Sequence, residues 1–123
     1  MRILIVDDSS TMRKIVLRTL RQAGYESAEV LEAGDGVAGL SVLDAGTVDL
    51  IFSDVNMPNM NGLDFVSAVR KRGPGPPIVM VTTEGGQDAI ADALQRGANG
   101  YVVKPFTPDK LGEVLASVLK GVT

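Results

Sequence analysis

Four short apolar segments of this chain end in polar residues that can take part in phosphoryl transfer. Segment 3–6 is followed by Asp7 and Asp8, segment 50–53 by Asp54, segment 78–81 by Thr82, and segment 100–103 by Lys104. If the segments are neighbouring parallel strands, their carboxyl ends meet at one edge of a sheet, where open α/β folds place their sites. That edge would bring together three carboxylates, a hydroxyl and an ammonium group.

Such a cluster needs positive charge, because neighbouring carboxylates repel one another by several kcal/mol at intermediate dielectric. Carboxylate and carbonyl oxygens suit a hard divalent cation such as Mg²⁺, and Lys104 supplies a second positive charge. Asp54 at a strand end can attack phosphorus and form an acyl phosphate. Taken singly, each residue also has an ordinary interpretation as a turn, cap, strand or solvated loop residue. Their shared position favours the phosphoryl-transfer interpretation.

The composition predicts a single globular domain and excludes several kinds of site. The 123 residues are 45% apolar and 22% charged, with a net charge of −3 and no basic stripe. We therefore expect no nucleic-acid partner. Cysteine and histidine are both absent, which excludes disulfides, thiolate metal sites and a Ser-His dyad. The apolar start is too short for a signal peptide or a membrane span. We expect a cytoplasmic protein with no membrane partner.

Strand-length apolar runs alternate with helical patterns along the chain. We expect strands near 3–6, 27–32, 48–52, 78–81 and 100–103. We expect helices from Ser9 or Ser10 to Ala23, over 35–45, from Gly62 onward, and over 87–96 and 107–120. The Gly/Pro cluster at 73–77 is interpreted as a loop, not a domain linker. Five strands alternating with five helices predict an α/β fold with a parallel sheet.

Four motifs then resemble those of a known family. V-D-D-S-S-T-M-R, S-D-V-N-M-P-N-M-N-G, M-V-T-T-E and G-Y-V-V-K-P-F, in this order, resemble the receiver domains of two-component response regulators, those of chemotaxis above all. The resemblance covers essentially the whole chain. It implies one receiver domain over 1–123, with a doubly wound, flavodoxin-like fold and strand order 2-1-3-4-5. Asn61 and Val55 depart from the family, which often has Asp and, in chemotaxis regulators, Trp at these positions.

The resemblance also implies a role for individual residues. Asp54 would be the phosphoacceptor. The Mg²⁺ ligands would be the carboxylates of Asp8 and Asp54 and the main-chain carbonyl of Asn56, with Asp7 assisting through water. Thr82 and Lys104 would contact the phosphoryl oxygens, Tyr101 would be an aromatic switch, Asn56 and Glu84 would tune dephosphorylation, and the Lys104–Pro105 bond would be cis.

The implied function is a signalling switch rather than an enzyme, with only self-phosphorylation and self-dephosphorylation. A histidine kinase would donate the phosphoryl group, and a phosphatase is a possible further partner. The helix at 87–96, the strand with Tyr101 and the helix at 107–120 would form the output surface of a monomer. Its target would be the flagellar motor switch protein or another effector.

Three alternatives stay open. A Mg²⁺-dependent aspartyl phosphatase usually has an acid two residues after its nucleophile, where this chain has Asn56. A flavin-binding module of the same topology is disfavoured, since Asp7 and Asp8 would repel the flavin phosphate. The chain could also be a receiver cut from a larger regulator, or one with a different output.

Overall fold

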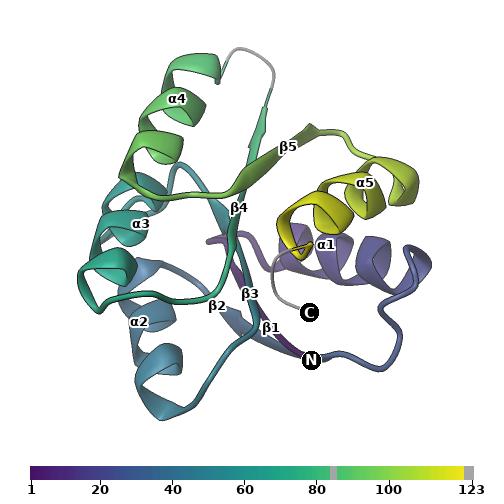
Figure 1. The fold of residues 1–123 in the computed structure, drawn as a ribbon, viewed down its shortest axis with the longest axis horizontal. Helices are drawn as coiled ribbons and strands as arrows, with labels where there is room; N and C mark the ends of the chain where they lie inside the picture. The colour runs from purple at the N-terminus through teal and green to yellow at the C-terminus, as the bar shows by residue number, and fades with distance from the viewer. Residues whose placement is uncertain (84–85, 121–123) are drawn as a thin grey trace.

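The computed structural model describes residues 1–83 and 86–120, which form a five-stranded parallel sheet with five helices (Figure 1). Strands and helices alternate along the chain, as the apolar periodicity predicts. Their bounds are β1 Arg2–Val6, α1 Ser10–Gln22, β2 Glu29–Ala33, α2 Gly36–Ala45, β3 Leu50–Asp54, α3 Gly62–Lys71, β4 Ile78–Thr83, α4 Gln87–Arg96, β5 Gly100–Lys104 and α5 Pro108–Val118.

The strands lie in the order β2-β1-β3-β4-β5, which confirms the predicted topology. Their register aligns the carboxyl ends: Val6 lies opposite Ser53, and Asp54 lies opposite Val81. On the far side of β4, Thr83 lies opposite Lys104. The polar residues at the carboxyl ends of β1, β3, β4 and β5 are therefore held at one edge of the sheet.

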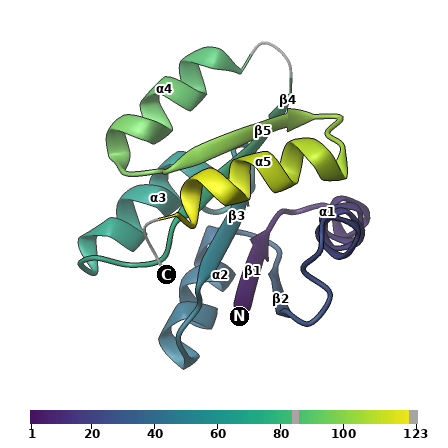
Figure 2. The ribbon, with the colours of Figure 1, turned by 45° about the vertical axis from the view of Figure 1, so that its right-hand side comes forward.

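The helices form a layer on each face of the sheet. Helices α1 and α5 cover one face, and α2, α3 and α4 cover the other (Figures 1 and 2). The central strands β1, β3 and β4 are buried on both sides, which is why their sequences are apolar at nearly every position. Phe52 and Leu111 belong to the core beneath α1 and α5, and Phe65 belongs to the core beneath the other three helices.

Short polar side chains begin four of the five helices, each accepting a hydrogen bond from a backbone N–H of the first turn. These N-caps are Ser9, Asp35, Asn61 and Thr107. Helix α4 begins instead at Gly86, which provides no side-chain cap. The α4 end that faces the site edge therefore lacks this stabilising contact.

The predicted boundaries differ from the structure by a few residues. Strands β2 and β3 begin and end later than the predicted 27–32 and 48–52, so that Asp54 is the last residue of β3 rather than a loop residue. Residues 35 and 107 are caps, and α5 ends at Val118. Within the described residues, none of the helices has the length and apolar character needed to cross a bilayer.

Candidate functional site

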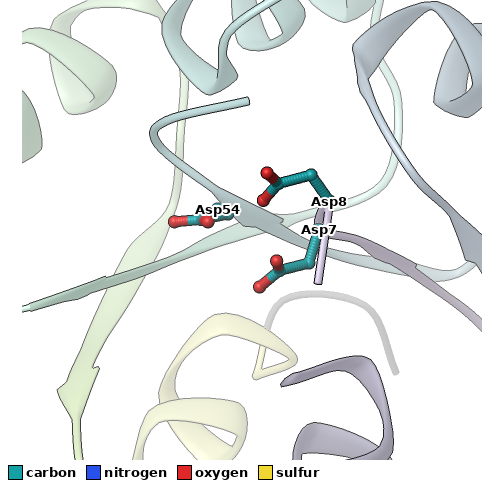
Figure 3. Close-up of side chains that lie close together, drawn as sticks. All are labelled: Asp7, Asp8 and Asp54. Atoms are coloured by element: carbon teal, nitrogen blue, oxygen red, sulfur yellow. The ribbon is translucent and has the colours of Figure 1, made fainter. Parts of the chain in front are cut away.

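Three carboxylates meet at the carboxyl edge of the sheet (Figure 3). Asp7 and Asp8 follow β1 directly, and Asp54 ends the neighbouring strand β3. One carboxylate oxygen from each of the three lies within 4.8 Å of the others. The predicted acidic cluster is therefore present, formed from the ends of two strands, and Asp7 and Asp54 are 47 residues apart in sequence.

The three acids differ in burial. Asp7 is only 3% exposed, Asp54 is partly buried, and Asp8 is open to solvent. Burial is the main cause that raises the pKa of both Asp7 and Asp54, since removal from water disfavours the charged form. Asp8 raises the pKa of each further through charge repulsion. The cluster thus holds more negative charge than its own surroundings stabilise.

Lys104 is the cation of the described residues that reaches this cluster. Its Nζ lies 3.9 Å from Asp7 Oδ2 and 3.9 Å from Asp54 Oδ1. These contacts lower the pKa of both acids, but less than burial raises it. Lys104 ends β5 and precedes Pro105 through a cis peptide bond, as predicted.

Backbone N–H groups bind part of each buried carboxylate. The Ser9 N–H donates to Asp7 Oδ1 at 2.9 Å, and the Val55 N–H donates to Asp54 Oδ1 at 2.8 Å. The backbone of Asn56 also contacts the Asp54 carboxylate and lowers its pKa. These bonds hold both side chains in fixed orientations, with oxygens still able to bind a cation or attack phosphorus.

The loop between β3 and α3 closes tightly behind Asp54. The Gly62 N–H donates to the Val55 carbonyl at 2.7 Å. A Cβ atom on Gly62 would lie 2.0 Å from the Asp54 carbonyl oxygen, so the loop can close this tightly only with glycine at this position. Asn56 lies exposed in the loop, beside the acidic cluster.

The donor set suits a hard divalent cation. All three side chains offer carboxylate oxygen, the ligand that Mg²⁺ prefers. Two oxygens bound to one Mg²⁺ at about 2.1 Å are at most about 4.2 Å apart. The observed limit of 4.8 Å therefore requires only a small inward movement, or one water-mediated contact.

Thr82 lies on β4, the strand next to β3, and Tyr101 lies on β5, the strand beyond it. Thr82 is buried, and its hydroxyl donates a long hydrogen bond of 3.4 Å to the Thr83 carbonyl. Tyr101 is 46% exposed. Both line an open cavity of about 360 Å³ between β4, α4 and β5, together with Ile90 and Leu94. Glu84, the second predicted tuning residue, lies outside the described residues.

Several contacts around the site were not identified from the sequence. Arg13 donates to the Asp7 carbonyl at 2.6 Å, and Asn59, with φ of 65°, donates to Asp35 at 2.6 Å. A Cβ on Gly86 would lie 2.3 Å from Thr82 Oγ1. These contacts join residues distant in sequence or depend on backbone conformation. The Asn-Met-Asn-Gly pattern at 59–62 is the sequence signal from which a special loop geometry could have been predicted.

Comparison with known proteins agrees with this geometry. The family model described as the response regulator receiver domain matches residues 3–116. The chemotaxis protein CheY1 of Helicobacter pylori is 51% identical over 97% of each chain. The chemotaxis protein CheY of Pseudomonas aeruginosa is 45% identical over 99% of this chain and 98% of its own length.

Solved structures agree as well. The chemotaxis protein CheY4 of Vibrio cholerae has a TM-score of 0.84 and 42% identity, covering 96% of this chain and 98% of its own. A putative response regulator from Chloroflexus aurantiacus has a TM-score of 0.88 and 31% identity, covering 97% of each chain. The chain therefore belongs to the response regulator receiver domain family of two-component systems, and its similarity is to the chemotaxis members of that family.

Proposed function

We propose that this protein is a phosphorylation-activated switch in which Asp54 accepts the phosphoryl group. The observation that carries the proposal is the meeting of Asp54 with two further carboxylates and Lys104 at one edge of the sheet. A general anion site would not place three carboxylates around the binding position, whereas a cation-assisted phosphoryl acceptor needs them. The protein acts as a signalling protein, not as an enzyme on an external substrate.

The transfer step uses an oxygen of Asp54 as the nucleophile. It attacks the phosphorus of a phosphohistidine on a partner kinase, an O–P bond forms, and the N–P bond breaks with its electrons going to the imidazole. The donor histidine belongs to another protein, because this chain has none. Asp7, Asp8, Asp54 and the carbonyl of Asn56 would hold Mg²⁺, which neutralises charge on the phosphoryl oxygens. Lys104 contacts one of these oxygens.

The phosphoryl group then changes the contacts of Thr82. Its hydroxyl exchanges the long bond to the Thr83 carbonyl for a phosphoryl oxygen. This movement frees space in the adjacent cavity, and the half-exposed ring of Tyr101 turns into it. A change of ~1–3 kcal/mol in the equilibrium between the outward and inward positions of Tyr101 alters target affinity about 5- to 150-fold. Asn56 and Glu84 tune the attack of water that ends the signal.

The output surface comprises α4, β5 and α5. Helix α4 has only Ile90 and Ala93 buried and no side-chain N-cap, so its first turn can shift at low cost. The similarity to chemotaxis proteins points to a flagellar motor switch protein as the target and to a histidine kinase as the donor. We place the protein in the cytoplasm as a monomeric single receiver domain over 1–123, with a phosphatase as a possible further partner.

Incubation with acetyl phosphate and Mg²⁺, followed by intact-mass measurement, tests this proposal. We expect one phosphoryl group per chain, and loss of the label with excess chelator. Asp54→Asn should abolish labelling, whereas the control Asp44→Asn, at the far end of α2, should label normally. Labelling that survives Asp54→Asn or chelation would reject the assignment.

A further inference from the structure

The end of β2 and the turn that joins it to α2 contribute no residue to the acidic cluster, yet they are linked by hydrogen bonds to both parts of the chain that form it. We name residues 32–35 the bracket. Its backbone carbonyl at Ala33 accepts from the Asp7 N–H at 3.0 Å. The Asp35 side chain binds Asn59 in the loop after Asp54, and the Glu32 side chain binds Arg13 of α1, which in turn donates to the Asp7 carbonyl. We propose that Glu32 and Asp35 are positioning residues that set the separation of the two halves of the cation site.

The first connection runs through Arg13 on α1. Its Nε donates to Glu32 Oε1 at 2.9 Å, and its NH1 donates to the Asp7 carbonyl oxygen at 2.6 Å. One planar guanidinium thus bridges the bracket and the peptide that joins Asp7 to Asp8. The Arg13 side chain is 19% exposed, so water competes little for these donors. With Arg13 held, the peptide carrying both acids cannot rotate freely.

The second connection runs through Asn59 in the loop after Asp54. The Asn59 amide donates to Asp35 Oδ2 at 2.6 Å, while Asp35 Oδ1 accepts from the Ala38 N–H at 2.8 Å as the N-cap of α2. One carboxylate therefore fixes a helix start and a site loop together. Among the described residues, Asn59 is the non-glycine residue with positive φ, and this conformation aims its side chain at the bracket.

Packing strengthens the second connection. Gly36, the residue after the bracket, lies against Met60, the residue after Asn59. A Cβ on Gly36 would come within 2.7 Å of Met60 Cγ, so glycine allows the loop to lie directly on the start of α2. The same loop carries Asn56, whose carbonyl is the proposed third ligand. The bracket therefore sets where that carbonyl stands relative to Asp8.

This inference rests on the proposed function, because it assigns the bracket a role in Mg²⁺ binding. Asp35→Ser keeps a helix cap but loses the oxygen that Asn59 needs. Asn59→Gly keeps the positive φ at no steric cost but loses the amide. Glu32→Ala breaks the first connection alone. Asp44→Ser is the matched control, since Asp44 joins α2 to Arg72 at the opposite edge of the sheet.

The measurement is Mg²⁺ affinity by NMR titration of the ¹⁵N-labelled full chain, with amide hydrogen exchange recorded before Mg²⁺ is added. We expect Asp35→Ser, Asn59→Gly and Glu32→Ala each to weaken Mg²⁺ binding about 3- to 10-fold. The double variant Asp35→Ser/Asn59→Gly should bind Mg²⁺ as weakly as either single variant, because both substitutions remove the same hydrogen bond. In the double variant Glu32→Ala/Asn59→Gly, the two fold-losses of Mg²⁺ affinity should multiply, because the substitutions release different parts of the site. Without Mg²⁺, Asn59→Gly should speed exchange at Asn56.

The outcomes separate the two proposals. If the unmodified protein binds no Mg²⁺, the proposed function fails. If it binds Mg²⁺ and the bracket variants bind equally well, the bracket has no positioning role. Equal weakening by Asp44→Ser would also overturn the inference, since it would indicate general loosening. If Asp35→Ser does not fold, Asn59→Gly and Glu32→Ala decide the question alone.

Discussion

Replacement of Asp7 by asparagine should stabilise the metal-free protein at neutral pH. Asparagine has the same shape, and its side-chain oxygen can still accept from the Ser9 N–H. The change removes the negative charge of a residue that is only 3% exposed and lies beside two other carboxylates. It should also weaken Mg²⁺ binding, so stability and function would respond in opposite directions.

The magnitude follows from the distances. At 4.8 Å, the upper limit of the separations between the carboxylate oxygens, repulsion from Asp54 is about 3.5 kcal/mol at an effective dielectric of 20, and repulsion from the exposed Asp8 is about 0.9 kcal/mol at that of water. Attraction to Lys104 at 3.9 Å is about 4.3 kcal/mol at a dielectric of 20. These contributions nearly cancel, and the desolvation of Asp7 remains. We therefore expect a gain of about 1–3 kcal/mol in the free energy of unfolding.

The effect depends on pH with a definite sign. Because the folded-state pKa of Asp7 is raised above 3.8, the folded protein holds this proton to higher pH than the unfolded chain does. The wild-type protein therefore loses stability as pH rises from 3.8 through the raised pKa. Asp7→Asn should lack this loss, so its advantage should grow as pH rises through the raised pKa of Asp7 and vanish below pH 3.8.

Urea unfolding with chelator present, repeated with Mg²⁺ at many times its dissociation constant, is the assay. The midpoint of Asp7→Asn should lie higher by about 1 M without metal. Mg²⁺ at a hundredfold excess over its dissociation constant should stabilise the wild type by about 2.7 kcal/mol and the variant by much less. Asp44→Asn, the control, should be neutral or slightly destabilising. An Asp7→Asn protein that is less stable than wild type without metal would refute the reasoning.

Two further substitutions and the lifetime of the phosphorylated state have definite expected results. Gly62→Ala should destabilise the fold by about 1–3 kcal/mol in thermal unfolding, since its Cβ would meet the Asp54 carbonyl oxygen at 2.0 Å; wild-type stability would contradict the tight loop closure. Lys104→Ala should still be phosphorylated but lose most target binding, and complete loss of labelling in a folded variant would count against this division of roles. The phosphorylated state, followed by mass over time, should last on the order of tens of seconds to minutes, as Asn56 and Glu84 imply by family resemblance; persistence for many hours would rule this out.

The sheet edge and its acids were predictable because they depend on local patterns. Continuous apolar runs identified the strands, and the parallel connections fixed which ends meet. Asp7, Asp8, Asp54 and Lys104 were therefore expected at one edge, and the structure places them together there.

Other features depend on contacts that a sequence pattern does not contain. The bonds of Arg13 to Glu32 and of Asn59 to Asp35 join residues 19 and 24 positions apart. The late start of β3 has a similar cause, because Asp49 pairs with the Arg2 backbone before the strand begins. Leu94 fits the apolar stripe of α4 but is 43% exposed, because it borders the cavity beside Tyr101.

The position of the phosphoryl group tests the central claim most directly. After reaction with acetyl phosphate and Mg²⁺, borohydride reduction converts a phosphorylated aspartate to homoserine, and peptide sequencing by mass spectrometry locates it. We predict homoserine at position 54 alone, with Asp7 and Asp8 unchanged. Homoserine at position 7 or 8, or none in a protein that carries a phosphoryl group, would contradict the account.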